Sequence, residues 1–207
     1  NIAHADKLTM GLTLIEKNGC NGCHKINSLE SRRKAGPDLA RINEKVDKDW
    51  VLKWIKNPKG FRHNTRMPSF FGQSNNSEPE LIERNETEIA TIVEYLFRDG
   101  EKKNKRNDRK YLGDSGNGEK IFGKVGCKGC HIIEPNPENM PEITDQNQML
   151  KQHGPNLIGL GSKTSAKWIF NWLKDPSSYW HETRMPNLRL SDSEARDLTS
   201  YLLSFEN

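Results

Sequence analysis

A five-residue pattern of two cysteines and a histidine occurs twice in this chain, and it restricts the fold more than any other feature. The first copy spans residues 20–24 (CNGCH) and the second, 107 residues later, spans residues 127–131 (CKGCH). The chain has four cysteines, so the two copies use all of them and leave none for a disulfide. Each copy therefore predicts one site built from two thiols and an imidazole.

Three kinds of site use cysteines spaced in this way: a redox dithiol, half of a zinc site, and a point of covalent haem attachment. A zinc site would join its two cysteine pairs across a short loop, whereas these pairs lie 107 residues apart. The histidine after each second cysteine favours haem. The two thiols can add to the porphyrin vinyl groups while the imidazole binds the iron from the same side. The motif predicts two covalently bound haems c.

The motif belongs to a longer pattern that also occurs twice. Residues 11–20 align with residues 118–127, and both read as a short helix, with Leu8, Leu12 and Ile15 forming an apolar stripe in the first copy. A Gly-Pro pair follows each motif, now at an offset of 118. The change in offset indicates an insertion within residues 134–153, where proline and asparagine predict a surface loop.

The Gly-Pro pairs are predicted to support the histidines. A histidine that binds iron normally donates its other ring N–H to a fixed carbonyl group. The carbonyl groups of Pro37 and Pro155 are the predicted acceptors for His24 and His131. The alternative is that each Gly-Pro pair only forms a turn.

Tryptophans four residues apart mark the next repeated element. Residues 50–58 match residues 168–176, and each is predicted as an amphipathic helix that ends at a proline, with Asp47 and Ser165 as N-caps. The following loop carries Met67 in the first copy and Met185 in the second. A thioether opposite the imidazole would complete the coordination of the iron and raise its reduction potential. The other methionines have no repeated counterpart and are read as packing or surface residues: Met10, Met140 and Met149.

Each methionine has a rival ligand four residues before it, His63 in the first copy and His181 in the second. Imidazole also binds iron well, and a haem with two histidine ligands has a lower potential. We favour the methionines and read the two histidines as loop or haem-edge residues. Arg66 and Arg184 are predicted either to pair with haem propionates or to lie in solvent.

Each copy closes with an amphipathic helix. Its start reads as a capping box, at residues 85–88 in the first copy and 191–194 in the second. Residues 71–84, which precede the first of these helices, are rich in serine, asparagine, glutamate and proline and are predicted as an inserted loop. Tyr95 and Tyr201 occupy matching positions. Each closing helix is predicted to pack on the first helix of its own copy.

The chain resembles class I c-type cytochromes, twice over, in the order of its motifs. These motifs are a glycine-bearing helix, C-x-x-C-H, G-P-x-L, a tryptophan helix, a T-R-M-P loop and a closing helix with a tyrosine. The tandem arrangement is similar to dihaem carriers of the cytochrome c4 type and to dihaem subunits that accompany quinol-oxidising complexes. The resemblance implies an all-α fold of two tandem class I domains, each wrapped around one covalent haem. It implies that the haems are attached through Cys20, Cys23, Cys127 and Cys130. It also implies that the proximal iron ligands are His24 and His131, and that the distal ligands are Met67 and Met185.

Composition and charge agree with this interpretation. The hydrophobic content of 33% is low for 207 residues, and two haems would supply apolar core. The net charge of +4 comes from residues 98–110, with seven basic and three acidic side chains. Residues 101–113 are predicted as a charged linker between an N-terminal domain, residues 1–100, and a C-terminal domain, residues 114–207. The alternative for the basic run is a docking patch for an acidic partner.

The expected function is one-electron transfer between redox protein partners in a respiratory chain, and not enzymatic catalysis. An iron with protein ligands on both faces has no open position for a substrate. Two alternatives remain: a dihaem subunit of a membrane quinol-oxidising complex, and a haem enzyme of the peroxidase or thiosulfate-oxidising type. No apolar run is long enough to span a bilayer, and no stacking aromatics indicate nucleic acid. We expect a periplasmic or other extracytoplasmic location, with a signal peptide removed.

Overall fold

The computed structural model describes residues 2–26, 36–62, 65, 67–73, 78–99, 105–136, 139 and 154–206, and it contains helices and no strands in these ranges. The predicted helical class is therefore confirmed for this part of the chain. The chain divides into two compact units, Asn1–Lys103 and Asn104–Asn207, and the division falls within the predicted linker. Among the described helices, none is long and apolar enough to cross a membrane.

The first unit is built around the last of its helices, α6, against which both α1 and α4 pack. Its buried core includes Ile15 of α1, Val51 of α4 and Val93 of α6. The described helices of this unit, in chain order, are α1 (Ile2–Lys17), α2 (Cys20–Cys23), α3 (Ile42–Lys45), α4 (Lys48–Lys56), α5 (Pro58–Phe61) and α6 (Pro79–Leu96).

The second unit repeats this plan, with α10 packed against both α7 and α9. Its core includes Phe122 of α7, Ile169 of α9 and Leu198 of α10. The described helices, in chain order, are η2 (Lys105–Tyr111), α7 (Ser115–Lys124), η3 (Cys127–Gly129), α9 (Ala166–Lys174), η5 (Pro176–Ser178) and α10 (Asp192–Leu203).

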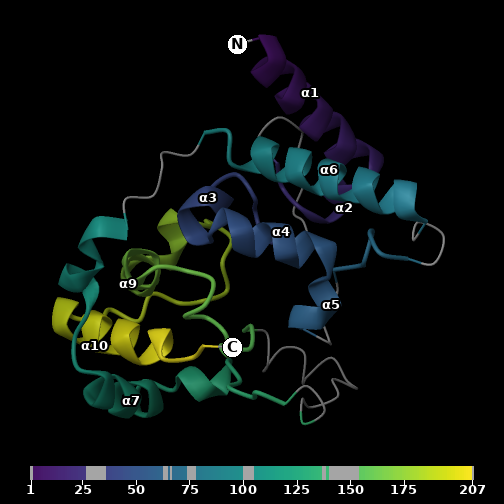
Figure 1. Cartoon of the computed structure of the whole chain (residues 1–207). Coiled ribbons are helices and arrows are strands. Elements are labelled where there is room, and N and C mark those ends of the chain that lie inside the picture. The colour runs from purple at the N-terminus through teal and green to yellow at the C-terminus, as the bar shows by residue number, and fades with distance from the viewer. Residues whose placement is uncertain are drawn as a thin grey trace. The chain divides into compact units, whose positions relative to one another are not determined.

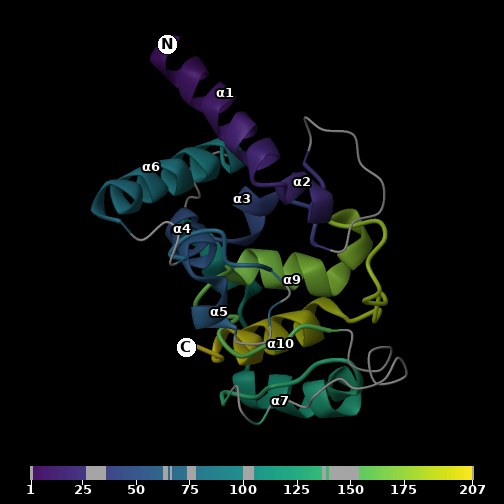
Figure 2. The same cartoon turned by 90° about the vertical axis from the view of Figure 1, so that its right-hand side faces the viewer.

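A glycine lets the first helix of each unit approach the last one closely (Figures 1 and 2). A Cβ atom added to Gly11 of α1 would lie 2.6 Å from the Cβ of Tyr95 on α6. A Cβ atom added to Gly118 of α7 would lie 2.8 Å from the Cβ of Tyr201 on α10. The two tyrosines predicted to be equivalent therefore mark the same helix crossing.

The predicted start of the first closing helix is wrong. Helix α6 begins at Pro79 with Glu78 as its N-cap, so residues 85–88 lie inside the helix and not at a capping box. Proline is favoured in the first turn, and the carboxylate of Glu80 complements the helix dipole there. The predicted loop over residues 71–84 is therefore helical from Pro79 onward, and α6 has 18 residues whereas α10 has 12.

The other predicted helix starts are present. Ser191 and Glu194 form the predicted capping box at the start of α10. Asp47 and Ser165 are the N-caps of α4 and α9, and the Ser165 side chain accepts a capping hydrogen bond from the N–H of Trp168. The tryptophan helices of both units therefore begin at the same repeated position.

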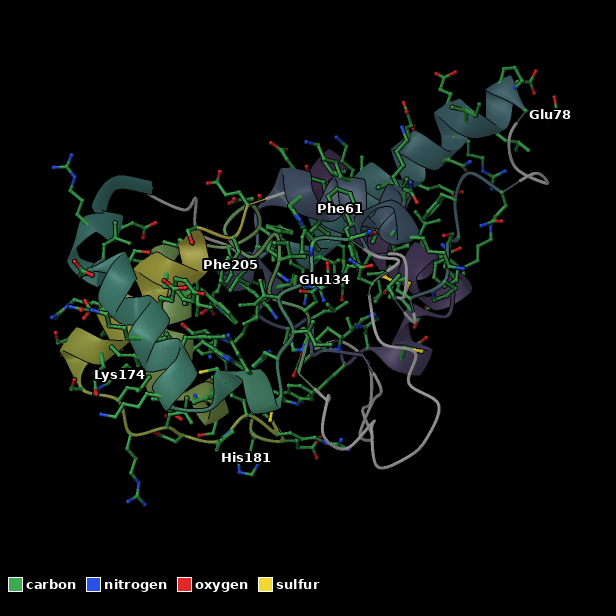
Figure 3. All side chains as sticks on the ribbon, turned by 90° about the horizontal axis from the view of Figure 1, so that it is seen from below. Phe61, Glu78, Glu134, Lys174, His181 and Phe205 are labelled. Carbon is green, nitrogen blue, oxygen red and sulfur yellow. The ribbon has the colours of Figure 1, made fainter. Side chains whose placement is uncertain are left out.

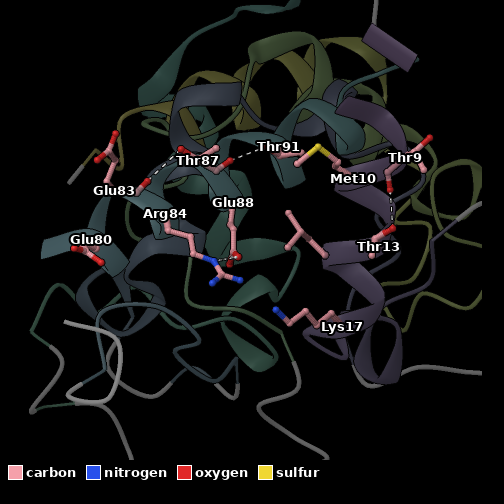
Figure 4. Close-up of a pocket in the computed structure, with 11 residues that line it drawn as sticks. Thr9, Met10, Thr13, Lys17, Glu80, Glu83, Arg84, Thr87, Glu88 and Thr91 are labelled. Carbon is pink, nitrogen blue, oxygen red and sulfur yellow. Dashed lines mark hydrogen bonds and ion pairs between the residues drawn. The ribbon is translucent and has the colours of Figure 1, made fainter. Parts of the chain in front are cut away.

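The extra turns of α6 form one wall of an open groove with a volume of about 640 Å³. Figure 4 shows Thr13 and Lys17 of α1 facing Arg84 and Glu88 of α6 across this groove. Arg84 and Glu88 form an ion pair at 3.0 Å. The insertion therefore changes the outer surface of the first unit between its first and last helices.

The C-terminal part of the charged segment packs on the second unit. The Tyr111 ring lies 5.3 Å from the Phe170 ring of α9, measured between centroids. The backbone carbonyl of Lys110 accepts a hydrogen bond from Arg196 Nε of α10 at 3.0 Å. Residues 108–111, which fall within the predicted linker of residues 101–113, are therefore part of the second unit.

We predict that Gly118→Ala destabilises the protein by about 1–3 kcal/mol, because the added methyl group overpacks the crossing of α7 and α10. Gly123→Ala, in the same helix, is the matched control, since a Cβ there meets no atom within 4 Å. It is expected to raise stability by about 0.5–1 kcal/mol. Denaturant unfolding of both variants measures the difference, and equal free energies of unfolding would refute the close crossing.

Candidate functional site

Each C-x-x-C motif forms a tight turn directly after the first helix of its unit. Cys20–Cys23 is the short helix α2, and Cys127–Gly129 is the 3-10 turn η3. The preceding residues, Gly19 and Gly126, have φ angles of 68° and 85°, a left-handed conformation that strains other residues. The glycines thus allow each helix to turn at once into the cysteine pair.

The first thiol of each motif lacks the lowered pKa on which a redox dithiol depends. All four cysteines are free, and Cys23 is exposed whereas the other three are half-buried. Burial raises the pKa of the Cys20 and Cys127 thiols above the ordinary value. A redox C-x-x-C motif depends on a thiol whose pKa is lowered. The site therefore favours thiols that act as attachment points.

The predicted contact between histidine and proline is present in both units. His24 Nδ1 lies 2.8 Å from the Pro37 carbonyl oxygen, and His131 Nδ1 lies 2.9 Å from the Pro155 carbonyl oxygen. In the tautomer that donates from Nδ1, the lone pair of Nε2 is available for a metal. Each imidazole is thus oriented as an iron ligand would be.

The glycine before each of these prolines lies directly against the imidazole. A Cβ atom on Gly36 would lie 2.6 Å from His24 Cε1, and a Cβ atom on Gly154 would lie 2.7 Å from His131 Nδ1. The Gly-Pro segment therefore packs on the ring as well as accepting its hydrogen bond. The alternative, in which each Gly-Pro pair only forms a turn, does not account for these contacts with the imidazole.

Each methionine sulfur accepts a hydrogen bond from a tryptophan, which lies in α4 in the first unit and in α9 in the second. Trp54 Nε1 lies 2.9 Å from Met67 Sδ, and Trp172 Nε1 lies 2.8 Å from Met185 Sδ. An indole N–H can only donate, and a thioether sulfur has two lone pairs. One lone pair is used by the indole, so the other remains for a metal.

Aromatic stacking fixes these tryptophans. In each unit two indoles stack at 5.1 Å, and a third ring packs edge-on or tilted against the pair. The sequence reasoning missed the third ring, although it recurs at the same offset of 118 in both copies. The two clusters are Trp50, Trp54 and Phe61, and Trp168, Trp172 and Tyr179.

The rival ligand of the second unit does not share this environment. His181 is exposed, and Figure 3 shows it at the edge of the second unit. Met185 is half-buried and is held by Trp172. Arg184 is exposed. In this unit the geometry favours the methionine as the partner of the histidine.

Several predicted residues lie outside the described part of the chain, so their placement stays a prediction. They include the rival ligand and the arginine of the first copy, and two of the three methionines read as packing or surface residues. These residues are His63, Arg66, Met140 and Met149. Met10 is exposed and lines the groove between α1 and α6.

Two cations that the sequence reasoning missed lie near each other in the first unit. Lys45 ends α3 and Arg62 follows α5, and both are half-buried. Burial lowers the pKa of Lys45 to about 8, and the nearby charge of Arg62 contributes to this shift. Burial also lowers the pKa of Arg62. Two like charges in a desolvated place favour an anionic group beside them, such as a carboxylate.

Comparison with known proteins identifies one of the two units. Residues 115–206 match the family model described as cytochrome c. Cytochrome c oxidase subunit 2 of Bacillus subtilis (strain 168) is 32% identical over 95 residues, which cover 41% of this chain and 24% of that protein. The chain thus spans about a quarter of the length of this relative. No solved structure matches the chain.

The family match makes residues 115–206 a cytochrome c domain. Such a domain implies a covalently bound haem c, electron transfer by a haem protein, and redox proteins as partners. Proteins of this family are generally electron carriers and not enzymes. The thiols, the imidazole and the thioether found in the second unit are the kinds of group that such a haem requires.

Proposed function

We propose that the chain is a dihaem c-type cytochrome that passes single electrons between redox protein partners. The observation that carries this proposal is the repetition of the whole site in both units. Each has a C-x-x-C turn, an imidazole on a proline carbonyl group, and a methionine sulfur on an indole N–H. The first unit thus has the same set of contacts as the unit that matches the cytochrome c family.

Ion pairs outside the site also support a second cytochrome c domain in the first unit. Lys56 at the end of α4 pairs with Glu86 of α6 at 2.8 Å. Lys174 at the end of α9 pairs with Asp192 of α10 at 2.9 Å. The lysines of the two pairs match at the offset of 118, and their acidic partners match at an offset of 106, which is also the offset between Tyr95 and Tyr201. Within each unit, the tryptophan helix is therefore joined to the closing helix at an equivalent point.

The proposed roles of the site residues follow from their chemistry. The four thiols attach the haems, the two imidazoles bind iron through Nε2, and the two thioethers bind it from the opposite side. The thiols are those of Cys20, Cys23, Cys127 and Cys130, the imidazoles are those of His24 and His131, and the thioethers are those of Met67 and Met185.

The protein residues keep each site unchanged while its charge changes by one. Haem iron supplies a one-electron couple between the ferric and ferrous forms. The Pro37 and Pro155 carbonyl groups hold the imidazole rings in one orientation, and the Trp54 and Trp172 indoles hold the sulfurs. Two firm protein ligands leave no position for a substrate. This favours electron transfer to another redox centre over catalysis.

A second candidate function is that of a subunit within a membrane-bound respiratory complex. The similarity to an oxidase subunit of Bacillus subtilis favours this candidate over a haem enzyme. Both functions place the protein outside the cytoplasm, which a cytochrome c domain fits. Salt washing of native membranes separates them, because a carrier is released by salt whereas a subunit stays with its complex.

We predict two covalent haems per chain, both low-spin when ferric and both with the near-infrared band of sulfur-ligated iron. In Met67→His and Met185→His variants, one midpoint potential falls by about 100 mV or more, since a second imidazole favours the ferric state. Mass spectrometry, absorption spectra and a redox titration measure these properties. A single haem per chain, or a persistent high-spin fraction with rapid peroxide turnover, contradicts the proposal.

We also predict that Trp54→Phe and Trp172→Phe each lower the midpoint potential of one haem by about 20–60 mV. The indole N–H withdraws electron density from the sulfur, and a neutral hydrogen bond contributes about 0.5–1.5 kcal/mol. The matched controls are Trp50→Phe and Trp168→Phe, which change the stacked neighbour and keep the donor to sulfur. Equal shifts in test and control variants would show that stacking, and not the hydrogen bond, sets the potential.

A further inference from the structure

We propose that Lys174 is a positioning residue that holds the loop after Met185, so that the second unit retains its sulfur ligand more firmly than the first unit retains Met67. The inference rests on the proposed role of both methionines as iron ligands. It assigns a different behaviour to two sites whose immediate ligands are the same.

Lys174 connects three elements of the second unit. From the end of α9, its Nζ donates to the Leu190 carbonyl oxygen at 2.7 Å and pairs with Asp192 Oδ1 at 2.9 Å. The Lys174 side chain is 34% exposed, and Leu190 is 5% exposed and belongs to the core. A charged donor partly shielded from water forms a stronger hydrogen bond than an exposed ion pair. This one ammonium group therefore joins α9, the end of the methionine loop and the start of α10.

The loop that Lys174 holds is short and strained. Residues 186–191 connect Met185 to α10, and Arg189 within them has a φ angle of 53°. Among the described residues, Arg189 is the one non-glycine with a positive φ angle. Its N–H is bonded to Asn187 Oδ1 at 2.9 Å. Strained backbone of this kind persists only where neighbouring contacts hold it, and the Leu190 anchor follows directly.

The two methionine loops begin in the same way. The Met67 N–H lies 3.2 Å from Thr65 Oγ1, and the Met185 N–H lies 3.2 Å from Thr183 Oγ1. Each sulfur then accepts its indole hydrogen bond at nearly the same distance. The difference between the loops therefore lies after the methionine.

After Met67 the sequence up to α6, residues 68–78, is longer than residues 186–191 of the second unit. Phe71, which is 6% exposed, belongs to the core. Lys56, the counterpart of Lys174, pairs with Glu86 inside α6, and both side chains are 60% exposed. That pair joins α4 to α6 and bypasses the loop. The lysine of the first unit therefore ties two helices, whereas the lysine of the second unit also holds the ligand loop.

This difference has a chemical consequence for ligand exchange. A competing ligand can reach the iron only if the sulfur and its loop move away. In the second unit that movement breaks the contact between Lys174 and the Leu190 carbonyl oxygen. In the first unit no corresponding lysine contact is attached to the loop within the described residues. We therefore expect Met67 to be displaced at a lower concentration of competitor than Met185.

Full-length chains with one sulfur ligand each allow the two sites to be read separately. In a Met67→His chain the near-infrared band reports Met185 alone, and in a Met185→His chain it reports Met67 alone. Imidazole is the competitor, and loss of the band measures displacement. We expect Lys174→Met, which keeps the aliphatic stem, to lower the imidazole concentration for half-displacement of Met185 by about three- to tenfold. Lys174→Arg is expected to restore most of the resistance.

Lys56→Met in the Met185→His chain is the matched control, and its imidazole titration is expected to change less than about twofold because that ion pair is exposed. Asp192→Asn removes the ion pair of Lys174 but leaves the Leu190 carbonyl contact, so it is expected to have a smaller effect than Lys174→Met.

An unchanged titration in Lys174→Met would overturn the inference, as would an equal effect of Lys56→Met or Asp192→Asn. Absence of the near-infrared band from the unmodified protein would instead overturn sulfur ligation, and with it the proposed function.

Discussion

The hydrogen bond from each histidine Nδ1 to a proline carbonyl oxygen is the contact on which both units depend. It fixes the plane of an imidazole that follows directly after two thiols, so three reactive groups are held in one short turn. The glycine before the proline must then lie against the ring, where a side chain has no room. Later in each unit, a tryptophan N–H donates to a methionine sulfur.

Local patterns were enough to predict the repeated elements, because each depends on residues close in sequence. The Ser191 capping box is an example. The two histidine contacts span 13 and 24 residues, and the chemistry of an iron-binding imidazole predicted them instead. The start of α6 was misread because two sets of helix-start signals compete, and Pro79 with Glu80 prevails over the later set. The indole bonds to sulfur and the nearness of Lys45 to Arg62 depend on tertiary packing. No local periodicity reports such contacts.

The two halves of the chain share a site but differ around it. The second half carries the match to the cytochrome c family, and the first half repeats its contacts with different surroundings. Longer helices, an open groove and a pair of half-buried cations distinguish the first unit. A buried loop anchor and a docked 3-10 turn distinguish the second. Under the proposed function, two centres with the same ligand types would thus have different surroundings.

The glycine crossings also bear on how the protein is made. Each joins the first helix of a unit to its last, so neither helix gains its main packing surface until nearly the whole unit has been synthesised. Both crossing helices of the first unit precede the second unit in the chain. The N-terminal half can therefore complete this crossing from its own residues alone, before the C-terminal half has folded.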